Sequence, residues 1–570
     1  MSQEQASPAM SSVTPAQDRP IGEPVPKRSV WMALVVIAMA ISIIIMDGTI
    51  VDVALPKIMV DLKLSFTSAE WIVTLYSLVF ASLLITFGRI ADHIGRKKMM
   101  IAGVTVFAIG AIVSALANGL WPMLAGRFVQ GAGGAMIMPT TVSSINALFK
   151  GKKRIIAFAT YGTAISVAAA AAPVIGGLFT TYSTWRWIFW FDVIWTVLVV
   201  ALAAPFLPET FGEKINGRFD FWGFILSVIA FSCIVYGLID GKNYGWWHAD
   251  AGTKSWWGMS RIFWILLVGV IALVGLIWLE LALARSGKSR LMSLELFKYR
   301  SFWLGDVIDA IGMIGEYGLV FLLPLYLQNV LGLSALRTGV ILCVMGGGAF
   351  FSGGSATPFV RATNAKTVVF TGFLIEAISM GGFFFTIRPD SSHTGLIYLW
   401  LALYGVGLGF ASAQLTSVAM VDIPDSKAGQ ASSMMSTVGQ LGSALAIAVI
   451  GTCLVSFLWA ALPARLDDGL GLPEQAAHGI STAVIDSAGS AIPELKASPE
   501  LNRMPRSYRA AFGAKLDEGF TAGVTDTIGV ASCILLAGAV CALFLPAEKK
   551  RKETEEQAIE STAVGEQSEA

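Results

Sequence analysis

The chain has 570 residues, of which 55% are hydrophobic and only 14% are charged, and 40 Lys and Arg nearly balance 39 Asp and Glu. A water-soluble domain carries far more charge, so the composition predicts a protein whose solvent is a lipid bilayer. The charge balance gives no reason to expect a nucleic-acid partner. The five cysteines stand apart in apolar runs, without disulfide or zinc spacing, and we expect no metal and no cofactor.

The predicted elements start after a polar segment. Residues 1–29 are rich in Pro and Ser, and we interpret them as a disordered cytoplasmic tail. The apolar run that follows is too long for a signal peptide and is the first of fourteen candidate helices, each near the roughly 20 residues that cross a bilayer. These runs begin near Trp31, Ser68, Met99, Leu120, Ile155, Trp185, Asp220, Arg261, Ser301, Ala335, Thr367, Gly395, Ala431 and Val524.

The fourteen helices predict an all-α polytopic membrane protein with two six-helix bundles and two inserted central helices. Residues 30–207 form the N-terminal bundle, and residues 208–300 hold the two inserted helices and a basic cytoplasmic linker. Residues 301–546 form the C-terminal bundle, which includes a hydrophilic extracytoplasmic loop at 463–521, and residues 547–570 are a second cytoplasmic tail. Two halves around a central path are the plan of a transporter.

Lys and Arg concentrate in alternate connections. The basic connections include Arg89–Lys98, Lys150–Arg154, Lys214 with Arg218, and Arg285–Arg300, and they alternate with connections that are poor in Lys and Arg. Basic loops stay in the cytoplasm, so we expect both termini there, in a plasma membrane. The sequence has no Asn-X-Ser/Thr sequon, which favours a bacterial cell membrane.

The turn between the second and third helices, Gly88–Lys98, combines glycines, a carboxylate and a basic cluster. Glycine permits a tight turn, Asp92 can accept from backbone N–H groups or from an arginine, and basic residues can bind helix C-termini or acidic lipids. An ordinary basic loop is the alternative. The residues of this predicted conformational latch are Gly88, Arg89, Asp92, Gly95 and Arg96.

Asp47 and Arg127 are charged residues inside predicted helices. At 1.5 Å per residue, Asp47 lies roughly 24 Å along the first helix and Arg127 roughly 10 Å from the outer end of the fourth. Their depths match, so we predict an ion pair. An arginine keeps a neighbouring carboxylate ionised and separation lets it bind a proton, so the pair is a candidate for proton coupling. A purely structural salt bridge is the alternative.

Several segments resemble the major facilitator superfamily, and in particular its fourteen-helix drug:proton antiporter branch. Gly88–Lys98 resembles the loop signature, Arg127–Ala135 the fourth-helix motif and Asp47–Pro56 the first-helix signature. This branch usually has Asn where this chain has Asp52, which we expect near the outer boundary, and also where it has Asp192. The antiporter motif of the fifth helix, with Ala172 in place of its usual Gly, corresponds here to Gly162, Pro173, Gly176 and Gly177.

The second half carries further carboxylates in predicted helices. Asp306, Asp309 and Glu316 share one face of the ninth helix at 100° per residue, and Glu376 lies midway along the eleventh. Ionised groups are costly in hydrocarbon, so we expect Asp309, Glu316 and Glu376 to carry protons or to recognise a cation. Polar and aromatic residues that we expect in the same central region, as a substrate cavity, are Tyr76, Gln130, Tyr161, Tyr326, Tyr404 and Gln414.

The resemblance implies a secondary active exporter that exchanges lipophilic, cationic drugs for protons by alternating access. Protons, membrane lipids and a small molecule are the expected partners. No phosphate-binding loop occurs, so we expect no use of ATP, and no catalytic constellation indicates an enzyme. The alternatives are an exporter of a physiological metabolite, lipid or siderophore, an intramembrane enzyme, and a membrane sensor.

Overall fold

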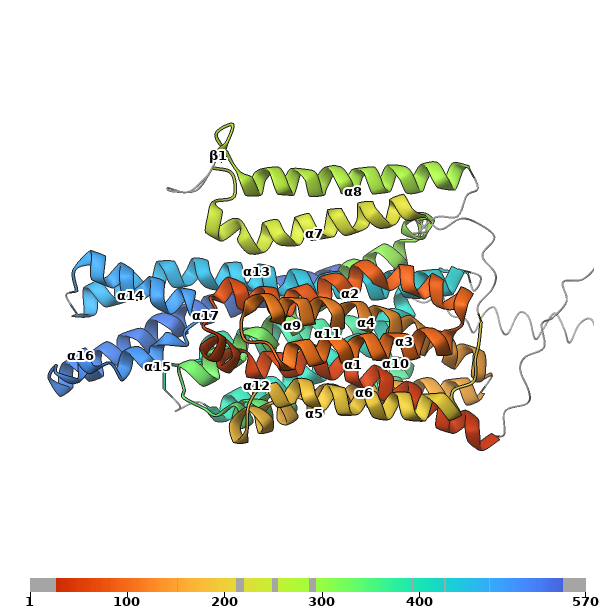
Figure 1. The fold of residues 1–570 in the computed structure, drawn as a ribbon, viewed down its shortest axis with the longest axis horizontal. Helices are drawn as coiled ribbons and strands as arrows, with labels where there is room; N and C mark the ends of the chain where they lie inside the picture. The colour runs from red at the N-terminus through yellow and green to blue at the C-terminus, as the bar shows by residue number, and fades with distance from the viewer. Residues whose placement is uncertain are drawn as a thin grey trace, which may run out of the picture.

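The computed structural model describes residues 27–150, 152–211, 220–248, 255–286, 294–390, 394–424, 427–470 and 472–546. Within these residues, fourteen helices of 20 residues or more form an elongated bundle (Figure 1). Their bounds are α1 Lys27–Leu62, α2 Phe66–Ile94, α3 Arg96–Ala115, α4 Leu120–Leu148, α5 Lys152–Tyr182, α6 Arg186–Phe206, α7 Phe221–Tyr244, α8 Arg261–Arg285, α9 Arg300–Asn329, α10 Ala335–Ala362, α11 Ala365–Thr386, α12 Thr394–Ala419, α13 Ala428–Leu470 and α17 Arg506–Ala542. A short 3-10 helix, η1 (Leu294–Lys298), precedes α9.

Thirteen of the described helices are long and apolar enough to cross a membrane. The remaining long helix, α4, contains Arg127 and Gln130 together with several glycines and hydroxyl residues. It packs between α2 and α3, which bury these polar groups inside the bundle. The fourteen predicted helices are therefore all present, and α4 is less apolar because its environment is protein on most sides.

Helices α1–α6 form one half, and α9–α13 with α17 form the other. We call the end of the bundle where α1 begins and α17 ends the tail end. The opposite end is the hairpin end, because a two-stranded hairpin between α7 and α8 lies there (Figure 1). In this hairpin, β1 (Ser255–Trp256) pairs antiparallel with β2 (Met259–Ser260). Trp257 and Gly258 both have positive φ, at 53° and 77°, which is typical of a type I′ turn.

Helices α7 and α8 lie beside the bundle rather than between its halves (Figure 1). α7 packs on α2 of the first half and on α13 of the second. Leu78, Val235, Ile239, Ala444 and Ala448 form the apolar cluster of this contact. The inserted pair is therefore central in the sequence but peripheral in space.

The segment 463–521, which we expected to be a loop, is mostly helical in its described residues. α13 continues through Pro463 to Leu470, and α17 already begins at Arg506. At 1.5 Å per residue the 43 residues of α13 extend about 65 Å, more than twice the hydrocarbon thickness. The three short helices at the hairpin end, which we call the cap, are α14 (Glu474–Asp486), α15 (Ala491–Lys496) and α16 (Pro499–Asn502).

The two halves join in an apolar core toward the hairpin end, and α2 and α13 also meet beside α7. Val53 and Met59 of α1 and Phe66 and Val73 of α2 belong to the same cluster as the core of the second half. Toward the tail end each half has its own cluster, one built by α1–α6 and the other by η1, α9, α12 and α13. The halves are thus joined at one end and separately packed at the other.

Candidate functional site

An ion pair lies at the centre of the first half, as predicted. Arg127 Nη1 donates to both carboxylate oxygens of Asp47 at 2.8 Å, and both residues are completely buried. Arg127 Nε donates to the carbonyl oxygen of Ile72 at 3.1 Å, which fixes the guanidinium against α2. The same guanidinium lies 4.4 Å above the ring of Tyr76, a cation–π arrangement. The matching helix depths therefore predicted a real contact.

Gln130 extends this pair into a network. Its Nε2 donates to Asp47 Oδ1 at 3.0 Å and approaches Asp192 Oδ2 of α6 at 3.5 Å. Its Oε1 accepts from Ser114 of α3 and from Arg127, each at 3.3 Å. Asp192 is fully buried, so it belongs to the charged network and not to an interfacial aromatic belt. We call Asp47, Arg127, Gln130 and Asp192 the N-half network.

Asp52 corrects one expectation. We expected it near the outer boundary, where water could hydrate it, but its side chain is 1% exposed and its Oδ1 has no hydrogen-bond partner among the described residues. It lies on α1 at the junction of the two halves, where Val53 and Leu55 already belong to the shared core. The two halves cover it because α1 contacts α9 next to Asp52, where Gln328 Nε2 donates to Val53 O at 2.9 Å.

The second half holds four carboxylates in its interior. Glu376 of α11 is 1% exposed, and neither of its oxygens has a hydrogen-bond partner in the described residues. Asp306 of α9 is also buried, and its oxygens also lack partners among the described residues. Asp309 and Glu316 are partly exposed. The carboxylates of α9 lie near one another, since Asp306 and Glu316 both interact with Asp309, and two of the three are partly exposed.

Tyr317 is a residue that the sequence reasoning missed. It interacts electrostatically with Glu316 and Asp309 of the second half and with Asp52 of the first. It also interacts with Tyr76, whose ring lies under the guanidinium of Arg127 in the N-half network. Its position directly after Glu316 was the available signal. Tyr317 thus lies between the two groups of buried charges.

The predicted cavity residues divide by location. Tyr404 lies beside the carboxylates, because a Cβ on Gly315 would be 2.9 Å from its hydroxyl oxygen and it interacts with Glu376. Gln414, on the same helix, is partly exposed. Tyr161 is a core residue of the first half and pairs with Thr141 Oγ1 at 2.9 Å.

The placement of Tyr326 in the central region was wrong. It lies in the last turn of α9 at the hairpin end, where its hydroxyl donates to the carbonyl oxygen of Arg388. α9 runs from Arg300 to Asn329, and Tyr326 lies in its last turn. Its ring therefore packs at the end of the bundle and not at the middle.

The predicted latch is a tight turn that ties helix ends together. Gly95 has φ 112° between α2 and α3, and Arg96 Nη2 pairs with Asp92 at 2.8 Å. Arg96 also donates to Ser143 O near the end of α4, at 2.9 Å. The backbone N–H of Lys97 donates to Glu209 at 2.9 Å, a partner that the sequence did not suggest. These contacts lie within the first half and the segment directly after α6.

The predicted antiporter segment of α5 lies where the halves meet. A Cβ on Gly176 would be 2.7 Å from Ile50 of α1, and one on Gly177 would be 2.7 Å from Leu336 of α10. The carbonyl of Pro173 is in direct contact with Gly339 of α10. Around Gly162, by contrast, space is open. Three of the four predicted residues therefore permit close helix packing at the hairpin end.

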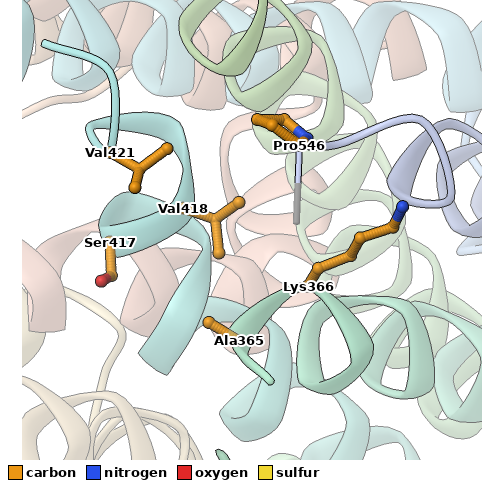
Figure 2. A pocket seen from close by; sticks show the side chains of 6 residues that line it. All are labelled: Ala365, Lys366, Ser417, Val418, Val421 and Pro546. Atoms are coloured by element: carbon orange, nitrogen blue, oxygen red, sulfur yellow. The ribbon is translucent and has the colours of Figure 1, made fainter. Parts of the chain in front are cut away.

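A small cavity at the tail end has no room for a substrate. It lies between α11, α12 and the residues that follow α17, and Figure 2 shows the side chains around it. Its volume is about 10 Å³, space for roughly one water molecule. The described residues also contain no group of three His, Cys, Asp or Glu that could hold a metal ion. The lining residues are Ala365, Lys366, Ser417, Val418, Val421 and Pro546.

Two six-helix halves that share a core at one end, with buried charges at their centre, define a transporter fold. The chain belongs to the Major Facilitator Superfamily, whose family model matches residues 37–447. It is therefore a membrane protein of a transporter family.

Curated relatives match over most of their length. The chain is 28% identical to the probable actinorhodin transporter of Streptomyces coelicolor, over 95% of this chain and 96% of that protein. It is also 28% identical to the multidrug resistance protein Stp of Mycobacterium tuberculosis, over 81% and 82%. A bacterial homologue of the human lysosomal transporter Spinster, solved inward-facing and unoccupied, shares the fold with a TM-score of 0.57 and 17% identity, over 91% of this chain and 98% of that one.

Proposed function

We propose that this protein exports lipophilic, cationic small molecules in exchange for protons. The observation that carries the proposal is the pair of buried charge groups, one in each half. The N-half network contains two carboxylates for one arginine. The second half contains Asp306, Asp309, Glu316 and Glu376 in its interior. Ionisable groups in this setting mark ion and substrate pathways.

The exchange follows from competition for carboxylates. Asp309 and Glu316 are partly exposed, and Glu376 lies close enough to Glu316 to interact with it. A cation that binds there favours the ionised carboxylates, whereas a proton neutralises them. Substrate and proton thus exclude each other at one site, which couples their opposite movements. Tyr404 supplies an aromatic face and a hydroxyl group beside this site.

We further propose that the tail end is cytoplasmic. The basic connections Arg89–Lys98 and Lys150–Arg154 lie there, and basic loops remain inside the cell. The halves meet at the hairpin end, so this arrangement corresponds to an inward-facing state of an alternating-access cycle. Residues Gly88, Arg89, Asp92, Gly95 and Arg96 then form a cytoplasmic latch on the first half.

The relatives support a drug or antibiotic as the substrate, since one is named for multidrug resistance. Another is named as a probable transporter of a single compound, actinorhodin. Export of a physiological metabolite is accordingly the second candidate function, and transport of such a compound with no response to lipophilic cations would favour it.

The proposal is tested by following lumenal pH in liposomes that contain the purified protein. Addition of a lipophilic cation such as ethidium should move protons in wild-type vesicles. Asp47→Asn, Glu316→Gln and Glu376→Gln should each reduce this flux by about tenfold or more, because each removes an ionisable group from one of the two charge clusters. Glu474→Gln, a change at an exposed carboxylate of the cap, is the control.

The outcomes separate the candidate functions. Flux in wild type and in Glu474→Gln, with loss in the three buried variants, supports proton-coupled export. Absence of any cation-evoked flux in wild type across a panel of cations contradicts the proposed substrate class. Flux that survives in all three buried variants contradicts their role in coupling.

A further inference from the structure

The N-half network contains two carboxyl groups but only one arginine. Arg127 Nη1 donates to both oxygens of Asp47, and its Nε donates to a backbone carbonyl of α2, so none of these hydrogen bonds reaches Asp192. Asp192 is completely buried and receives only a 3.5 Å approach from Gln130 Nε2 at its Oδ2. Its Oδ1 has no hydrogen-bond partner among the described residues. A buried carboxylate in such surroundings cannot remain charged at acceptable cost.

The carboxyl groups of Asp192 and Asp47 share one donor, because Gln130 Nε2 donates to Asp47 Oδ1 at 3.0 Å and to Asp192 Oδ2 at 3.5 Å. Two buried carboxylates this close repel each other unless one of them holds a proton. Asp47 is the ion-pair partner of Arg127 and therefore stays ionised. The proton belongs on Asp192.

We propose that Asp192 is the proton-carrying group of the first half and that Asp47 is the fixed counter-ion of Arg127. This inference rests on the proposed function and makes it more specific, because it assigns the proton to one side chain. When the halves rock and water reaches the network, Asp192 releases its proton and competes with Asp47 for Arg127 and Gln130. The return step protonates Asp192 again and restores the pair.

The charged groups around Asp192 are few. α1 contributes Asp47, α4 contributes Arg127, and α2 contributes Tyr76 at the edge of the network. α3 contributes the neutral Ser114 through Gln130. On α5, Tyr161 is the described ionisable residue away from the helix ends, and it pairs with Thr141 instead. The proton balance of Asp192 therefore depends on Asp47 and Arg127.

The test compares Asp192→Asn and Asp192→Glu with a matched control on the same helix. Thr196→Val is one turn further along α6, and Thr196 is equally buried but bonds only to its own helix, at Val193 O, among the described contacts. The number of protons exchanged per ethidium is measured in proteoliposomes from the membrane potential and pH gradient at which net flux reverses. Infrared spectra of the same samples report the carbonyl band of protonated, buried carboxyl groups.

We expect Asp192→Asn to exchange one proton fewer per substrate and to lose part of the protonated-carboxyl band, including its change with pH. Asp192→Glu should restore both, and Thr196→Val should match wild type. A wild-type ratio and a wild-type infrared band in Asp192→Asn would overturn the assignment. Equal loss of transport in Asp192→Asn and Asp192→Glu, with the infrared band unchanged, would also overturn it. If wild type itself moves no protons with ethidium, the proposed function fails, but the infrared comparison still decides whether Asp192 holds a proton.

Discussion

At the scale of single residues, one buried arginine organises the first half. Arg127 is surrounded by Asp47, the carbonyl oxygen of Ile72, Gln130 and the face of Tyr76, so its Nε and Nη1 have partners and its charge has a counter-ion. Lysine could supply the charge but not the planar fork that reaches two acceptors at once. The sequence predicted this pair because both residues are rare inside spans and stand at equal depth.

We predict that Arg127→Ala destabilises the protein strongly, by about 3 kcal/mol, because it leaves the buried Asp47 without a counter-ion. Asp47→Asn added to Arg127→Ala should recover roughly half of this loss, since the stranded carboxylate is removed. Thermal unfolding of the two single variants and the double variant in detergent measures the coupling. Strictly additive effects would show that the pair contributes nothing to stability.

At the scale of elements, the contact between α5 and α10 depends on glycines, which have no side chain to separate the two helices. Gly177 on α5 and Gly339 on α10 bring the two backbones together, and Thr181 Oγ1 accepts from Leu336 N at 2.9 Å. Small residues allow such close approach of helices in membranes. This contact is part of what joins the halves at the hairpin end.

We predict that Gly339→Ala weakens the joined state, because its Cβ would overlap the carbonyl of Pro173. Gly347→Ala is the matched control on the same helix, since no atom lies within 4 Å of its added Cβ. Both changes favour the helix itself by up to about 1 kcal/mol, so the difference between them isolates packing. Labelling of a cysteine at Ala335, which is buried against Gly177, by a soluble maleimide should rise severalfold in Gly339→Ala only. Equal labelling in both variants would contradict the role of this contact.

At the scale of the whole molecule, the structure combines a split tail end, a joined hairpin end and a cap on one side. The cap belongs to the second half, because Phe512, Leu516 and Phe520 of α17 share its apolar core with Val484 and Ile492. α7 meets both halves along α2 and α13. When one half rocks against the other, it must therefore either slide along α7 or move together with α7.

We predict that the hairpin end faces outward. In a variant without the five native cysteines, Trp257→Cys should react with a membrane-impermeant maleimide in intact cells, because Trp257 is 92% exposed on the β1–β2 turn. His93→Cys, exposed at the latch turn, should react only after the cells are permeabilised. The reverse pattern would invert the orientation and make the present state outward-facing.

The sequence by itself determined the bilayer as solvent, the fourteen helices, the pairing of Asp47 with Arg127 and the acidic face of α9. These follow from local physics, namely apolar run length, rise per residue and the cost of charge in hydrocarbon. Only the tertiary structure decided that Asp192 joins Asp47 through Gln130, that Tyr326 lies at the hairpin end and that Asp52 is covered. Such contacts depend on helix rotation and on how far each helix extends beyond the membrane, and apolar composition specifies neither.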